Sequence, residues 1–184
     1  MKEPINIVTI AAKNYLAHVR TLVDSFHKYN PRGQAFVLLV DRVDGYFDPK
    51  QEHFNLIGIE ELRNEMPDLD SICFQYSILE LSTALKPFLL NYLFHKFKIA
   101  KIAYFDPDIL ITDNLEYISE LLEKYNTALI PHITTPFNDN FKPSELEFLR
   151  AGAYNLGFIA MANKETNVFM LNWWEKRLYK QCIV

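Results

Sequence analysis

The sequence predicts an α/β fold with a Rossmann-like, mostly parallel central sheet and helices on both faces. The chain opens with an apolar segment, an amphipathic segment and a second apolar segment, which is the pattern of a βαβ unit. Both apolar segments are continuous instead of alternating, so their strands should be covered on both faces, as in parallel sheets. A chain of 184 residues that is 49% hydrophobic can bury one substantial core, and we expect a single domain over residues 1–184.

The first half of the chain is expected to contribute three strands and a helix before a longer helical region. Apolar runs predict strands at 5–10, at 35–40 and, more weakly, at 54–59. Residues 14–29 carry apolar side chains at helical spacing, so this segment is predicted to be a helix that stops at the turn-forming sequence Asn30-Pro31-Arg32-Gly33.

A helical pattern from about Gln75 to Phe97 is interrupted by Pro87. Proline lacks a backbone donor and clashes with the preceding helical turn, so we expect two helices, one ending near Thr83 and the next with Pro87 in its first turn. Later segments predict strands at 99–105, 127–130 and 154–161 and helices at 115–122 and 164–180. The polar, proline-rich segment 131–143 is expected to be a loop near a site.

Composition argues against several classes of protein. The net charge is −4 and no basic stripe is present, so nucleic acid is not an expected partner. The N-terminal apolar run is too short for a signal sequence or a transmembrane segment, and we expect a cytoplasmic protein. Cys73 and Cys182 lie far apart without metal-site spacing and are expected to be reduced. Because the chain stops directly after its last predicted helix, truncation at the C-terminus is one interpretation.

The stretch Lys101-Ile-Ala-Tyr-Phe-Asp-Pro-Asp-Ile-Leu-Ile111 places two aspartates at the end of a predicted strand. Side chains at i and i+2 of an extended chain point to the same side, so Asp106 and Asp108 should do so, and Pro107 should end the strand. Neighbouring carboxylates repel each other, and Mg²⁺ or Mn²⁺ shared with a diphosphate would relieve this. The tripeptide alone favours a turn. Its place at a strand end, where α/β sheets bind ligands, favours a metal site.

The order of motifs resembles a known family. An apolar strand is followed by an asparagine-tyrosine turn and a helix, then by a lysine before a helix, then by YFDPDILI and YNLGFIAM. This order resembles the nucleotide-sugar-dependent glycosyltransferases of GT-A fold, most closely the glycogenin-like and lipopolysaccharide galactosyltransferase-like group. The resemblance implies a GT-A-like nucleotide-sugar-binding domain in which Asp106 and Asp108 bind Mn²⁺ or Mg²⁺ and the donor diphosphate, with retention at the anomeric carbon. It also implies nucleoside contacts from Thr9, Ile10, Ala11 and Tyr15.

Further positions are candidates for the same site. Lys86 begins a helix, where backbone N–H groups attract anions, so it is a candidate phosphate ligand or, alternatively, a solvated lysine. Asn155 and Gly157 match a family segment that approaches the donor sugar and the acceptor; the alternative is a bulge with a surface asparagine. Asp41, at the end of the second strand, is a candidate contact to base or ribose, or equally a turn or cap residue.

We therefore expect a metal-dependent glycosyltransferase that moves a sugar from a nucleotide sugar, with a UDP-sugar as the first candidate, to a carbohydrate, lipid or protein acceptor. The catalytic set would be Asp106, Asp108, Lys86 and Asn155. One departure from the family is that no sequence after Gly157 matches its third metal ligand, a C-terminal histidine. A catalytically incomplete nucleotide-sugar-binding or interaction domain is therefore an alternative. A nucleotidyltransferase is another, but the segment 11–14 (AAKN) lacks the glycines of a phosphate loop.

Overall fold

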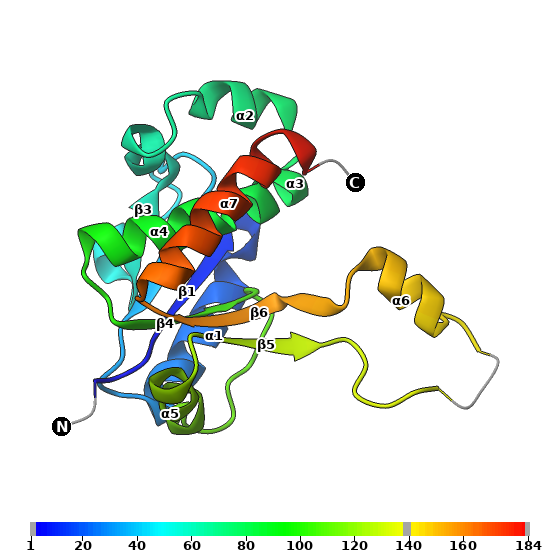
Figure 1. The fold of residues 1–184 in the computed structure, drawn as a ribbon. Coiled ribbons are helices and arrows are strands. Elements are labelled where there is room, and N and C mark those ends of the chain that lie inside the picture. Colours follow the sequence, from blue (N-terminus) through cyan, green and yellow to red (C-terminus); the bar gives the residue numbers. More distant parts are fainter. Residues whose placement is uncertain (1–2, 138–140, 183–184) are drawn as a thin grey trace.

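A computed structural model describes residues 3–137 and 141–182, which form a six-stranded sheet of order β3-β2-β1-β4-β6-β5 (Figure 1). The strands are β1 (Asn6–Ala11), β2 (Ala35–Leu39), β3 (Asn55–Gly58), β4 (Lys101–Phe105), β5 (Thr127–Pro131) and β6 (Tyr154–Ala162). The pairs β3–β2, β2–β1 and β1–β4 are parallel, whereas β6 is antiparallel to both of its neighbours. The predicted α/β class with a mostly parallel sheet is confirmed.

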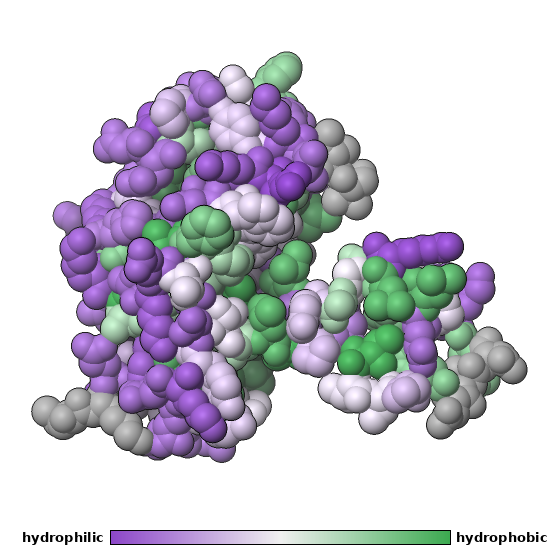
Figure 2. All heavy atoms as spheres, viewed as in Figure 1, coloured by the Kyte–Doolittle hydropathy of each residue, from purple (hydrophilic) through white to green (hydrophobic). Residues whose placement is uncertain are grey.

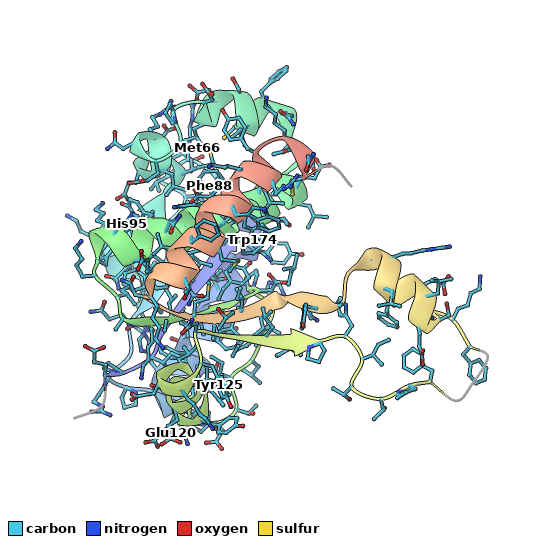
Figure 3. The ribbon with its side chains drawn as sticks, in the orientation of Figure 1. Met66, Phe88, His95, Glu120, Tyr125 and Trp174 are labelled. Carbon is cyan, nitrogen blue, oxygen red and sulfur yellow. The ribbon has the colours of Figure 1, made fainter. Side chains whose placement is uncertain are left out.

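Helices cover both faces of the sheet, as predicted (Figure 1). One face packs on α1 (Leu16–Tyr29) and α5 (Glu116–Lys124). The other packs on the helices α2 (Leu69–Gln75), α3 (Ile78–Ala84), α4 (Lys86–Lys96) and α7 (Glu165–Gln181). In Figure 3, Phe88 and Trp174 lie on the α4–α7 side, and Glu120 lies on the α5 side. Within the described ranges, no helix has both the length and the hydrophobicity needed to cross a membrane.

The break at Pro87 has the predicted form. Ser77 and Glu80 cap the start of α3, and α4 begins at Lys86 with Pro87 in its first turn. The strands agree with the expected ranges to within one or two residues. The predicted helix over 14–29 is correct except at its start, where Lys13–Tyr15 form a 3₁₀ turn before α1. Further 3₁₀ turns lie at Pro49–Gln51 and Ile59–Asn64.

The sequence interpretation missed α2 and α6 (Glu145–Ala151). The residues of α6 are exposed or half-buried, so the helix has no apolar stripe facing a core. Its only local signal is the capping pair at its start, where the backbone N–H of Ser144 donates to the Glu147 carboxylate at 2.7 Å.

The end of β5, the start of β6 and α6 project from the body of the molecule, and we call residues 130–137 and 141–156 the arm (Figure 1). Hydrophobic side chains gather around α6 in the arm (Figure 2). Those that are exposed include Ile130, Phe141, Leu146, Leu149 and Leu156. Within the predicted loop 131–143, residues 132–137 and 141–143 have neither helix nor strand, and 138–140 lie outside the described residues.

A polar contact joins α4 to α7 at a partly buried position. The side-chain amide of Asn91 donates to Glu175 Oε1 at 2.5 Å and to Asn172 Oδ1 at 2.9 Å. Among the described residues, Asn91 Oδ1 itself has no hydrogen-bond partner. Burial raises the pKa of the Glu175 carboxyl, and the nearby charge of Glu65 raises this pKa further. The charged form of Glu175 is therefore disfavoured in the folded protein.

Glu175→Gln is expected to stabilise the protein near neutral pH. The raised pKa means that Glu175 contributes stability below the ordinary glutamate value and that this contribution is lost as pH rises through the folded-state pKa. Glutamine stays neutral, and its amide can donate to Asn91 Oδ1, so we expect a gain of about 1 kcal/mol at pH 7 that shrinks toward pH 4. Urea unfolding of the wild-type protein and of Glu175→Gln across this pH range measures the gain in the free energy of unfolding. An equal difference at every pH would contradict the assignment to Glu175.

Candidate functional site

The carboxyl ends of β1 and β4 open into a cleft of about 480 Å³. One wall is the turn from Ile10 to Tyr15, and the other is α3. The base is formed by Lys86, Tyr104 and the segment Asp106–Asp108. A separate hollow of about 640 Å³ lies beside Lys101, where β4 begins. The cleft thus lies at the sheet edge at which open α/β folds bind their ligands.

Asp106 is fixed in the cleft by contacts from two neighbouring elements. Its backbone N–H donates to Gly157 O at 2.9 Å, which continues the antiparallel pairing of β4 with β6. Its Oδ1 accepts a hydrogen bond of 2.7 Å from the Tyr104 hydroxyl and lies 3.3 Å from the Lys86 ammonium. Tyr104 and Asp106 reach each other because residues i and i+2 share one side of an extended chain.

Lys86 is a buried cation at the base of the cleft, with 5% of its surface exposed. Its ammonium donates to Leu156 O at 2.9 Å and lies 4.4 Å from the centre of the Tyr104 ring. Burial lowers the pKa of Lys86, and the Asp106 carboxylate partly opposes this shift. Burial, together with the same carboxylate, raises the pKa of Tyr104 well above its usual value. The Tyr104 hydroxyl is therefore a stable donor near neutral pH.

Asp108 is exposed and lines the cleft together with Asp106. Hard divalent cations prefer oxygen ligands, and Mg²⁺ in particular is usually held by one or two carboxylates together with waters and substrate phosphates. The two aspartates fit such an ion if a diphosphate supplies further oxygens. Within the described part of the chain, no group of three or more histidine, cysteine, aspartate or glutamate side chains is arranged to hold a metal.

Asn155 and Gly157 lie at the start of β6, directly beside Asp106. Asn155 Oδ1 accepts the Gly157 N–H at 2.7 Å. A Cβ atom at Gly157 would lie 2.9 Å from Asn155 Oδ1 and 2.9 Å from Asp106 Oδ2. Two side-chain oxygens of the chain itself thus lie close to Gly157, and the approach of donor sugar and acceptor to this glycine stays a prediction.

The structure divides the predicted nucleoside contacts into two groups. Ile10, Ala11 and Tyr15 line the cleft, and 43% of the Tyr15 surface is exposed. Thr9 does not line the cleft and is only 1% exposed. It shares a strand face with Ile7 and Ala11, whose side chains pack in the core on the α1 side of the sheet.

Asp41 also lies outside the cleft lining, and its contacts correspond to the turn-and-cap alternative. Its carboxylate accepts the backbone N–H of Lys13 at 2.5 Å, and the Lys13 ammonium pairs with Asp44 at 2.6 Å. These contacts tie the loop after β2 to the turn that forms one wall of the cleft. A direct contact of Asp41 with base or ribose stays a prediction.

Several cleft residues were missed by the sequence interpretation. They are Ala12, Asn14, Ile78, Leu79, Ser82, Thr83, Tyr104 and Pro107. Tyr104 carried a signal, because it is a polar group inside an apolar run and stands two positions before Asp106. Ser82 and Thr83 stand one helical turn before Lys86. Only the fold shows that α3, which carries them, faces the turn that follows β1 across the cleft.

Comparison with known proteins gives a match by structure. No protein-family model matches the sequence, and no curated protein is significantly similar to it in sequence. The galactosyltransferase LgtC, solved with donor and acceptor sugar analogues, superimposes with a TM-score of 0.58 at 18% identity over 97% of this chain and 66% of LgtC. The glycosyltransferase GlyE of Streptococcus pneumoniae TIGR4 gives 0.55 at 15% identity, over 98% of this chain and 39% of GlyE.

The chain has a glycosyltransferase fold. Mouse xyloside xylosyltransferase 1 supports the same conclusion, with a TM-score of 0.54 at 10% identity over 97% of this chain and 76% of that enzyme. The glycosyltransferase fold agrees with the GT-A architecture that the sequence motifs implied. The chain spans 39% of the length of GlyE and 66% of the length of LgtC.

Proposed function

We propose that this chain binds a nucleotide sugar in the cleft and takes part in transfer of its sugar, with Asp106 and Asp108 holding Mn²⁺ or Mg²⁺ against the diphosphate. The observation that carries the proposal is the convergence of two carboxylates and a buried lysine at the carboxyl end of β4, within a glycosyltransferase fold. A UDP-sugar is the first candidate donor. The acceptor is a carbohydrate, lipid or protein of unknown identity.

The chain's own residues would mainly bind and orient the donor. Lys86 lies at the first turn of α4, so its charge and the helix N-terminus both favour a phosphate group nearby. Tyr15 and Ile10 offer an aromatic and an apolar surface to the nucleoside. Asn155 is not part of the cleft lining but lies next to Gly157 together with Asp106, and from there it would reach the sugar. A bound divalent ion would supply the positive charge that stabilises the departing diphosphate.

The two aspartates give a direct test. We expect calorimetric titration to detect binding of UDP and UDP-sugars in the presence of Mn²⁺, and we expect Asp106→Asn and Asp108→Asn each to weaken it by about 10-fold or more, since each removes a charged ligand. Asp113→Asn is the matched control. Asp113 is an exposed aspartate that does not line the cleft, and its carboxylate accepts a hydrogen bond from the backbone N–H of Asn114.

Binding that does not need a metal, or that survives both substitutions, would contradict the proposal. Incubation with a UDP-sugar and a panel of acceptors then separates transfer from binding. Release of UDP supports a glycosyltransferase. Release of pyrophosphate from UTP and a sugar phosphate would instead indicate a nucleotidyltransferase.

A further inference from the structure

The two oxygens of the Asp106 carboxylate have different surroundings. Oδ1 accepts the Tyr104 hydroxyl at 2.7 Å and lies 3.3 Å from the Lys86 ammonium. A carboxylate oxygen has two lone-pair directions, so these two groups occupy Oδ1. Both side-chain hydrogen bonds to Asp106 within the described residues go to Oδ1 and none goes to Oδ2, and 41% of the Asp106 side chain is exposed. The carboxylate therefore presents one occupied oxygen and one open oxygen.

We propose that Tyr104 is a positioning residue that, with Lys86, holds Oδ1 of Asp106 and so directs Oδ2 toward the cation and diphosphate. This inference rests on the proposed function. Tyr104 suits the task because it is 1% exposed and packed in the core between the sheet and α4, which leaves its hydroxyl little freedom to move. The carboxylate of an aspartate otherwise rotates easily about its last bond.

The Tyr104 ring also orders the other group that contacts Oδ1. The Lys86 ammonium lies 4.4 Å from the ring centre, at a distance at which the aromatic face attracts a cation. The third partner of Lys86 is the carbonyl of Leu156 at 2.9 Å. Tyr104 thus contacts Asp106 and Lys86, two of the charged groups of the cleft base, and it joins them to a strand that is paired on both sides.

The same grouping of tyrosine, lysine and carboxylate occurs a second time, outside the cleft. The Tyr92 hydroxyl donates to Glu61 Oε2 at 2.8 Å, and the Lys96 ammonium lies 4.8 Å from the Tyr92 ring and 2.9 Å from Glu61. Tyr92 is 4% exposed, so its ring is packed as closely as that of Tyr104. Tyr92→Phe therefore removes a hydroxyl that likewise donates to a carboxylate, and that also accepts from Lys96, without touching the cleft.

The test compares Tyr104→Phe with Tyr92→Phe by electron paramagnetic resonance of free Mn²⁺, titrated against protein in the presence of UDP. Tyr104→Phe keeps the ring and removes the hydrogen bond to a charged oxygen, so we expect Mn²⁺ to bind about 10-fold more weakly. Tyr92→Phe should leave Mn²⁺ affinity unchanged. Thermal melting of each variant reports on the fold.

Unchanged Mn²⁺ affinity in Tyr104→Phe, with binding lost in Asp106→Asn, would overturn the inference and leave the proposed function standing. A wild-type protein that binds no Mn²⁺ with UDP would overturn both. If Tyr104→Phe fails to fold, para-aminophenylalanine and para-methylphenylalanine at position 104 replace it. They are similar in size, and only the amino group can donate to Oδ1. Equal Mn²⁺ affinity for these two proteins would overturn the inference.

Discussion

Gly157→Ala is expected to abolish donor binding while leaving the protein folded. The new methyl group would lie 2.9 Å from both Asp106 Oδ2 and Asn155 Oδ1, which is inside ordinary contact distance. Both atoms are ends of side chains, so the clash is relieved by rotating them and not by moving the sheet. Rotation of Asp106 disrupts its contacts with Tyr104 and Lys86, and hydrogen bonds to charged groups are worth about 1.5–3 kcal/mol each, or roughly 10- to 100-fold in affinity.

Calorimetry with UDP and Mn²⁺ measures the loss, and urea unfolding checks stability. Gly58→Ala is the matched control, because Gly58 ends a strand of the same sheet and a Cβ atom there would meet nothing within 4 Å. We expect this control to bind the donor normally. Normal binding by Gly157→Ala would mean that the Asp106 carboxylate is not a ligand in the orientation described. A large loss of stability would mean that the backbone, and not the side chains, absorbs the strain.

Lys86→Met is expected to weaken diphosphate binding strongly at little cost in stability. Methionine has a similar length but no charge, so the cleft keeps its shape and loses its buried cation. Removing one charge-stabilising donor from an active site typically lowers a reaction rate by about 10²–10³-fold. Burial of Lys86 lowers its pKa, which means that keeping it charged is itself unfavourable. In Lys86→Met, the unfavourable burial of a charge is removed, and this offsets the loss of the ion pair between Lys86 and Asp106.

The measurements are affinities for UDP and UMP with Mn²⁺, together with the rate of UDP-sugar turnover. If Lys86 contacts the diphosphate, UDP should lose more affinity than UMP. Lys101→Met is the control, since Lys101 is likewise buried but lies at the start of β4, away from the cleft, where it pairs with Glu123 at 2.6 Å. It should lose stability and keep UDP affinity. Equal losses for UDP and UMP in Lys86→Met would assign Lys86 to holding Asp106 and Leu156 in place.

Local patterns in the sequence predicted much of the architecture. The continuous apolar strands and the single proline in a helical region are signals that act over a few residues, and they gave the parallel sheet and the break before α4. The same kind of local signal predicted that Asp106, Asp108 and Lys86 lie around one edge of the sheet. The structure brings all three to the cleft. Their roles as ligands stay predictions.

Other features could not be predicted because they depend on distant parts of the chain or on the direction of side chains. Whether β6 runs parallel or antiparallel to β4 decides whether Gly157 lies next to Asp106, and no local pattern fixes this. Thr9 and Ala11 share one strand face, yet only Ala11 lines the cleft, because Ala11 ends β1 whereas Thr9 lies two residues inside the strand. The hydrogen bond between Asp41 and Lys13 joins two loops that are apart in sequence.

The position of β6 also has a consequence for how the site forms during synthesis. The parallel part of the sheet, β3-β2-β1-β4, is complete once residue 105 has been made, but the carbonyl that holds Lys86 belongs to Leu156, which follows Lys86 by 70 residues. At translation rates of about 5–20 residues per second, the lysine waits on the order of 10 s for this acceptor. The cleft base thus becomes ordered only after the sheet has gained its antiparallel strand, and ligand binding by a nascent chain would mark that late step of folding.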